Sequence, residues 1–172
     1  MLRIIFLSLA LITIAHADAA ERRPLPAFTA TTTDDWLNGA PLRVEDLRGK
    51  VVLLDVWTFG CWNCYRSFPW LNALEARLAD APFQIVGIHS PEFAHERDPA
   101  QVRAKIAEFG LRHPVMLDND FAYWRALGNR YWPAYYLVDK HGDIRELHVG
   151  ETHEGDARAR AIEERIGALL AE

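Results

Sequence analysis

The chain of 172 residues has very little cysteine: two residues, both inside the tetrapeptide Cys61-Trp62-Asn63-Cys64. A structural zinc site needs about four ligands, usually from two such pairs or from one pair with suitably spaced histidines, and the sequence offers neither. A disulfide across so short a loop would constrain the unfolded chain little, which argues against a small fold held together by disulfides. The reading that is left is a dithiol that cycles between reduced and oxidised states.

The chain also lacks an excess of positive charge, internal repeats and low-complexity tracts. Its 24 acidic and 19 basic side chains give a net charge of -5, which argues against a nucleic-acid partner. Half of the residues are hydrophobic and 25% are charged, as expected for one globular domain with an apolar core.

The apolar stretch Ile4–Ile14 is shorter than the about 20 residues that a transmembrane helix needs. It follows Arg3 and precedes Ala15-His16-Ala17, which offers a small-x-small cleavage site. This pattern predicts a signal peptide over residues 1–17 and a mature domain over residues 18–172. The expected location is therefore periplasmic or secreted, with an uncleaved membrane anchor as the alternative.

The dithiol follows an apolar run, Val51–Trp57, that shows no alternation of polar and apolar side chains. Such a run is typical of a strand buried on both faces, and the pattern after it predicts a helix that begins near Cys61. Unpaired N–H groups and a partial positive charge at a helix N-terminus favour the thiolate, which is the nucleophile of disulfide exchange. We therefore predict that Cys61 attacks and that Cys64 resolves the mixed disulfide.

Apolar periodicity and turn signals predict the element order β-α-β-α-β-α-β-β-α, an α/β sheet that ends in an antiparallel hairpin. The turn signal Leu37-Asn38-Gly39-Ala40 predicts a further hairpin ahead of Val51. After the first strand and helix, the predicted strands cover 84–89, 115–117, 135–138 and 144–149, and the helices begin near Asp98 and Asp120, with a last one through Ile162 and Ile166.

From about Pro26 to Leu170 the chain resembles the thioredoxin superfamily. The matching features are Trp57–Cys64 as a Trp-x-x-x-Cys-x-x-Cys segment, Pro69 as the helix-kinking proline, Tyr131–Ala134 as the cis-proline loop, and Gly150 after the last strand. Within the superfamily it looks most like exported proteins of the TlpA, ResA and DipZ type. The resemblance implies a thioredoxin-like fold, in which helices flank a central mixed sheet that carries an N-terminal β-hairpin extension.

The resemblance also implies a thiol-disulfide oxidoreductase that exchanges a disulfide with partner proteins and acts as a reductant. It implies no cofactor besides the Cys61–Cys64 pair, no metal site, a monomer, and a membrane electron donor of the DsbD or CcdA type. Two features depart from the family pattern: Trp-Asn stands between the cysteines, and Gly60 stands where many relatives have Trp. Both departures bear on redox potential and partner choice.

Two carboxylates are candidate catalytic groups. Asp55 lies in the buried strand, where desolvation should raise its pKa, and the resemblance gives it the role of proton acceptor for Cys64. A structural aspartate, at a strand bend or paired with Lys50, is the alternative. Glu92 matches a glutamate near the dithiol in ResA-like proteins, and a solvated loop acid is the alternative.

Three further residues are candidates for substrate binding. The resemblance implies a cis bond before Pro133, opposite the disulfide, which would turn the backbone of Trp132 outward to pair with an extended substrate. Trp62 and Trp132 adjoin groups that must be exposed, so they are expected to form an apolar rim for a partner protein.

Two other functions stay open on the sequence. Thr58-Phe59-Gly60-Cys61 has the T-x-x-C spacing of peroxiredoxins, which would make the protein a thiol peroxidase, although Leu54 occupies the place of their proline. Two soft thiolates also suit Cu(I), which would make it a non-enzymatic copper carrier.

Overall fold

The computed structural model describes residues 23–172, and the predicted signal peptide lies outside this range. A six-stranded sheet in the order β1-β4-β3-β2-β5-β6 forms its centre. β2, β3 and β4 run parallel, whereas β1, β5 and β6 join antiparallel to their neighbours, so the predicted mixed sheet is confirmed. The strands are β1 Trp36–Leu37, β2 Val51–Trp57, β3 Phe83–His89, β4 Val115–Leu117, β5 Ala134–Val138 and β6 Ile144–Val149.

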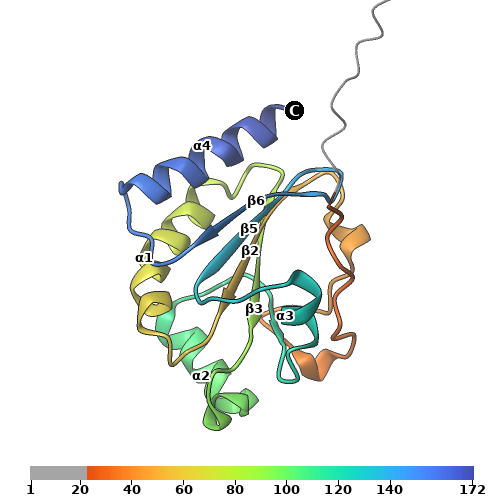
Figure 1. Ribbon diagram of the computed structural model, residues 1–172, viewed down its shortest axis with the longest axis vertical. Coiled ribbons are helices and arrows are strands. Elements are labelled where there is room, and N and C mark those ends of the chain that lie inside the picture. The colour runs from red at the N-terminus through yellow and green to blue at the C-terminus, as the bar shows by residue number, and fades with distance from the viewer. Residues whose placement is uncertain (1–22) are drawn as a thin grey trace, which may run out of the picture.

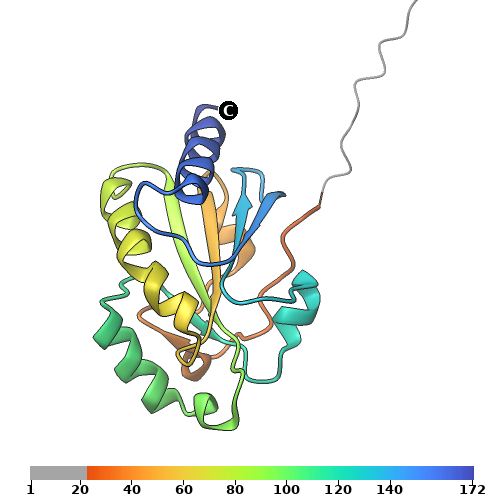
Figure 2. The same ribbon diagram turned by 60° about the vertical axis from the view of Figure 1, so that its left-hand side comes forward.

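Helices cover both faces of the sheet (Figure 1). The view in Figure 2 separates α1, α2 and α4 on one side from α3 on the other. The α-helices are α1 Trp62–Arg77, α2 Pro99–Phe109, α3 Ala122–Leu127 and α4 Ala157–Ala171, and short 3-10 helices are η1 Thr33–Asp35, η2 Val44–Leu47 and η3 Ala94–Arg97. No helix between residues 23 and 172 combines the length and the apolar character that a membrane crossing requires.

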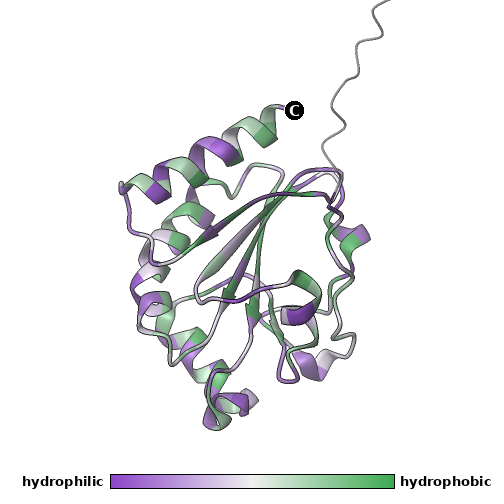
Figure 3. Cartoon of the chain, in the orientation of Figure 1, coloured by the Kyte–Doolittle hydropathy of each residue, from purple (hydrophilic) through white to green (hydrophobic). Residues whose placement is uncertain are grey.

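Two apolar layers hold the helices to the sheet. Strand β2 is buried along its whole length, because alternate side chains enter opposite layers. Leu53 and Trp57 pack with side chains of α1, α2 and α4, whereas Leu54 and Val56 pack with α3 and the N-terminal segment. In Figure 3, green apolar colour runs along parts of the central strands, and the long helices alternate between green and purple.

The predicted N-terminal hairpin is wrong. Within the described residues, Trp36 and Leu37 pair with Met116 and Val115 of β4, not with a neighbouring segment of their own region. Asn38 takes a left-handed conformation (φ 59°) and donates a hydrogen bond from Nδ2 to the Leu111 carbonyl, which directs the chain away from β1. The free edge of β4 therefore takes the place of a hairpin partner.

Candidate active site

The two cysteines form a disulfide at the N-terminus of α1, with their Cα atoms 5.3 Å apart. Cys61 is the N-cap residue, and its Sγ accepts a hydrogen bond of 3.2 Å from the Cys64 N–H. Cys61 is half-buried, whereas Cys64 is only 1% exposed. A reagent or partner from solvent therefore meets Cys61 first.

Asp55 lies at the middle of β2 and is 1% exposed. By strand alternation it shares the face of Leu53 and Trp57, which is the face that packs against α1 and the buried Cys64. Its Oδ2 has no hydrogen-bond partner among the described residues, and burial raises its pKa to about 8. Asp55 is therefore a desolvated acid, as expected. Its neighbours in register on the adjacent strands are Gly87 and Tyr135, and no ion pair with Lys50 is formed among the described residues.

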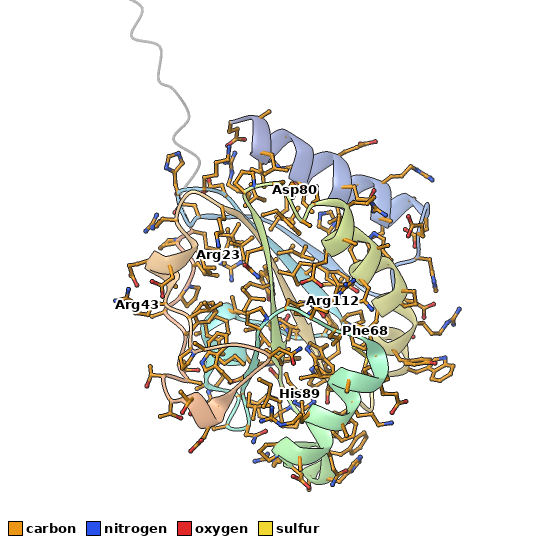
Figure 4. The ribbon with its side chains drawn as sticks, turned by 180° about the vertical axis from the view of Figure 1, so that it is seen from behind. Arg23, Arg43, Phe68, Asp80, His89 and Arg112 are labelled. Carbon is orange, nitrogen blue, oxygen red and sulfur yellow. A yellow bond between two sulfur atoms is a disulfide. The ribbon has the colours of Figure 1, made fainter. Side chains whose placement is uncertain are left out.

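His89 is a buried residue of the site that the sequence did not single out. It ends β3 in register with Trp57, and its ring contacts the rings of Trp57 and Phe59 at centroid distances of 4.8 and 5.7 Å. Burial lowers its pKa to about 4, so the ring is neutral at physiological pH. In Figure 4, His89 and Phe68 both lie near α2. The rings of both residues pack on the ring of Trp57. A histidine in an apolar strand is the signal that could have drawn attention to it.

Glu92 and Glu96 differ sharply in their surroundings. Glu92 is exposed on the loop after β3, whereas Glu96 is fully buried in η3. The Glu96 carboxylate accepts hydrogen bonds from the backbone N–H groups of Gly60, Glu92 and Phe93. The glutamate in contact with the dithiol loop is thus Glu96. The spacing of a glutamate three residues after a helix-start residue, here Phe93, is the pattern by which it could have been found.

The Trp132–Pro133 peptide bond is cis, and Pro133 is buried. Trp132 is half-buried, because its indole N–H donates to the Ser90 carbonyl at 3.0 Å and its ring packs on Trp124 at 4.3 Å. Trp62 is 66% exposed at the start of α1 and packs on Tyr65. The two tryptophans therefore differ: Trp62 projects into solvent, and Trp132 is fixed to the body of the protein.

A groove of about 320 Å³ runs past Cys61 between α1 and α2. Most of its lining side chains are aromatic, and α2 contributes one basic and one acidic side chain. The lining residues are Phe59, Gly60, Cys61, Trp62, Tyr65, Lys105, Glu108 and Phe109. Across residues 23–172, no three His, Cys, Asp or Glu side chains gather as they would around a metal ion.

A mixed sheet that presents a Cys-x-x-Cys disulfide at the start of its first long helix defines a thiol-disulfide oxidoreductase of the thioredoxin superfamily. The chain belongs to the redoxin family, which it matches over residues 20–163. The resemblance seen in the sequence is therefore confirmed.

Individual relatives agree with this assignment. YkuV, a thiol-disulfide oxidoreductase of Bacillus subtilis, is 30% identical over 151 residues, which cover 88% of this chain and 97% of YkuV. DipZ of Mycobacterium tuberculosis is 40% identical over 119 residues, or 67% of this chain. A solved thioredoxin-like protein in its oxidised form matches with a TM-score of 0.73 and 30% identity, over 87% of this chain and 96% of that protein.

Some relatives are much longer than this chain. The matched region is 17% of DipZ and 13% of the chloroplastic protein SUPPRESSOR OF QUENCHING 1 of Arabidopsis thaliana, which is 42% identical over 135 residues. The similarity to these two proteins therefore concerns a small part of each.

Proposed function

We propose that this protein is an exported thiol-disulfide oxidoreductase that reduces disulfides in partner proteins. The observation that carries the proposal is the asymmetry of the dithiol: Cys61 is accessible at a helix N-terminus, and Cys64 is buried behind it. The likeness to YkuV supports the same chemistry.

In the proposed cycle, the Cys61 thiolate attacks one sulfur of a substrate disulfide and displaces the other as a thiolate, which leaves a mixed disulfide. The Cys64 thiol then loses its proton and attacks the Cys61 sulfur, which releases the second substrate thiolate. Two electrons pass to the substrate, and the protein ends as the Cys61–Cys64 disulfide. A membrane electron donor of the DsbD or CcdA type would return it to the dithiol.

Asp55 is the proposed acceptor of the Cys64 proton. Its position on the face of β2 toward Cys64 and its lack of a partner on Oδ2 support this role, since the ionised fraction has a free oxygen to bind the proton. Glu92, exposed on the loop after β3, is the second candidate for proton transfer.

Substrate binding is proposed at Trp62, Trp132 and Pro133. The exposed indole of Trp62 offers apolar contact area beside Cys61, and the backbone of Trp132 would pair with an extended substrate segment. The signal-like pattern of residues 1–17 supports export to the periplasm or the medium, where the protein would work as a monomer.

The proposal is tested by trapping. Cys64→Ser should accumulate mixed disulfides with substrate proteins, whereas Cys61→Ser should accumulate almost none, and equal trapping would refute the assignment of Cys61. The reduction potential decides the direction: a value near about -270 mV indicates a reductant, and one near about -120 mV indicates an oxidant.

A further inference from the structure

Glu96 is a fully buried carboxylate that the exchange chemistry leaves unused. It stands in η3 between His95 and Arg97, both exposed, so burial is particular to this residue. Its Oε1 accepts from the Gly60 N–H at 2.8 Å, and its Oε2 accepts from the Glu92 and Phe93 N–H groups at 2.5 and 2.9 Å. A buried carboxylate is costly unless it is well hydrogen-bonded, and three charge-assisted bonds meet that requirement.

The bond to Gly60 joins two distant parts of the chain at the redox site. Gly60 directly precedes Cys61, and the Cys61 N–H in turn donates to the Thr58 carbonyl at 3.2 Å. A Cβ atom at Gly60 would lie 2.0 Å from Glu96 Oε1, so any side chain there would displace the carboxylate. The glycine before the dithiol and the buried glutamate are therefore one structural unit.

Glu96 is bound by backbone N–H groups, and no cationic side chain among residues 23–172 forms an ion pair with it. His89, which lies close enough for Glu96 to act on its pKa, is neutral. Lys105 and Glu108 line the groove beside Cys61 and form an ion pair of 2.8 Å, so their opposite charges largely offset each other. His95 packs on Phe59 and is exposed. Glu96 contacts Gly60, the residue directly before Cys61. A carboxylate near a thiol disfavours the thiolate, because like charges repel.

We propose that Glu96 is a positioning residue: it fixes the turn of Phe59 and Gly60 that presents Cys61, and its charge disfavours the Cys61 thiolate relative to the disulfide. The consequence is a more strongly reducing dithiol, because destabilising the reduced thiolate form lowers the reduction potential. This inference rests on the proposed exchange activity and adds a determinant of its direction.

Glu96→Gln tests the charge and the hydrogen bonds together. The amide keeps the size of the side chain, but only one of its two ends can accept a hydrogen bond, so one set of N–H donors loses its partner. Two measurements follow: the pH profile of Cys61 alkylation in a Cys64→Ser background, and the thiol-disulfide equilibrium of the intact dithiol with glutathione. We expect the alkylation midpoint to move to lower pH and the equilibrium to shift threefold to tenfold toward the dithiol, where tenfold corresponds to about 30 mV. Glu164→Gln, an exposed acid of α4, is the control for the change in net charge.

Gly60→Ala reaches the same unit from the other side and carries the test if Glu96→Gln does not fold. When Glu96 is present, the methyl group that Gly60→Ala introduces must displace its carboxylate. The alkylation midpoint and the glutathione equilibrium should then both shift in the same direction as in Glu96→Gln. In a Glu96→Ala background the space is free, and the same substitution should change them little. Folded variants with wild-type alkylation profiles and equilibria would overturn the role of Glu96. A wild type that reduces no insulin disulfides would instead overturn the proposed function.

Discussion

Asp55 is an acid held away from water, so its effect on folding depends on pH. Its pKa is about 8 in the folded protein and about 4 in the unfolded chain, so the folded state binds more protons between these values. The free energy of unfolding should therefore fall as pH rises from about 4 to about 8, by at most about 1.4 kcal/mol per pH unit, and then level off. Asp55→Asn should remove this dependence and be the more stable protein near neutral pH.

Urea unfolding of the oxidised wild type and of Asp55→Asn, at about pH 5 and about pH 8, measures this contribution. Taking the difference between the two proteins removes the contributions of titratable groups that they share. These include Asp46, Asp139 and Asp156, whose lowered pKa values make both proteins less stable as pH falls through the acid range. The gap should widen with pH in favour of the variant. Parallel curves would contradict the raised pKa of Asp55.

The same substitution should slow the chemistry. Asparagine keeps the shape of Asp55 but cannot take the proton of Cys64, so resolution of the mixed disulfide should slow by about tenfold, near the low end of what a positioned base contributes. Stopped-flow kinetics across pH would measure it. An unchanged rate with an unchanged pH profile would show that Asp55 has only a structural role. Glu92 would then be the next candidate for the proton acceptor.

At the scale of elements, the short helix α3 depends on a buried aspartate. Asp118 accepts from the Tyr123 and Trp124 N–H groups, both at 2.9 Å, and from the Ser90 hydroxyl at 2.8 Å. Asp120, the residue near which the sequence predicts the helix start, is exposed, and its carboxylate accepts from the Ala122 N–H at 3.0 Å. Asp118→Ala should therefore cost about 2–3 kcal/mol of stability and Asp120→Ala about 1 kcal/mol or less, by urea unfolding. Equal losses would contradict this division.

The sequence predicted elements well where the pattern is local. The unbroken apolar run of β2, the proline at the start of α2 and the glycines after α2 and α3 all act within a few residues, and the structure has each element in place. The pairing of β1 was predicted wrongly, because its partner strand β4 lies about 80 residues further along the chain. A local turn signal carries no information on pairing with so distant a strand. The contact of Glu96 with the dithiol loop could not be predicted for the same reason, because the bond to Gly60 spans 36 residues.

At the scale of the whole molecule, redox direction and stability are linked. A dithiol is a strong oxidant when folding stabilises its reduced form, as in DsbA, and a reductant when folding favours the disulfide. If the protein is a reductant, its oxidised form should be more stable than its reduced form. We expect the urea midpoint to fall when the protein is reduced with dithiothreitol, by a difference of about 1–3 kcal/mol in the free energy of unfolding.

The variant that lacks both cysteines, Cys61→Ser with Cys64→Ser, is the control, because its midpoint should not respond to dithiothreitol. Glu96→Gln should narrow the gap between oxidised and reduced protein, since the charge that disfavours the thiolate acts only on the reduced state. A reduced form more stable than the oxidised form would refute the reductant assignment while leaving the exchange chemistry of Cys61 and Cys64 intact. The stability difference thus measures whether folding lowers or raises the reduction potential of the dithiol, without knowledge of the substrate.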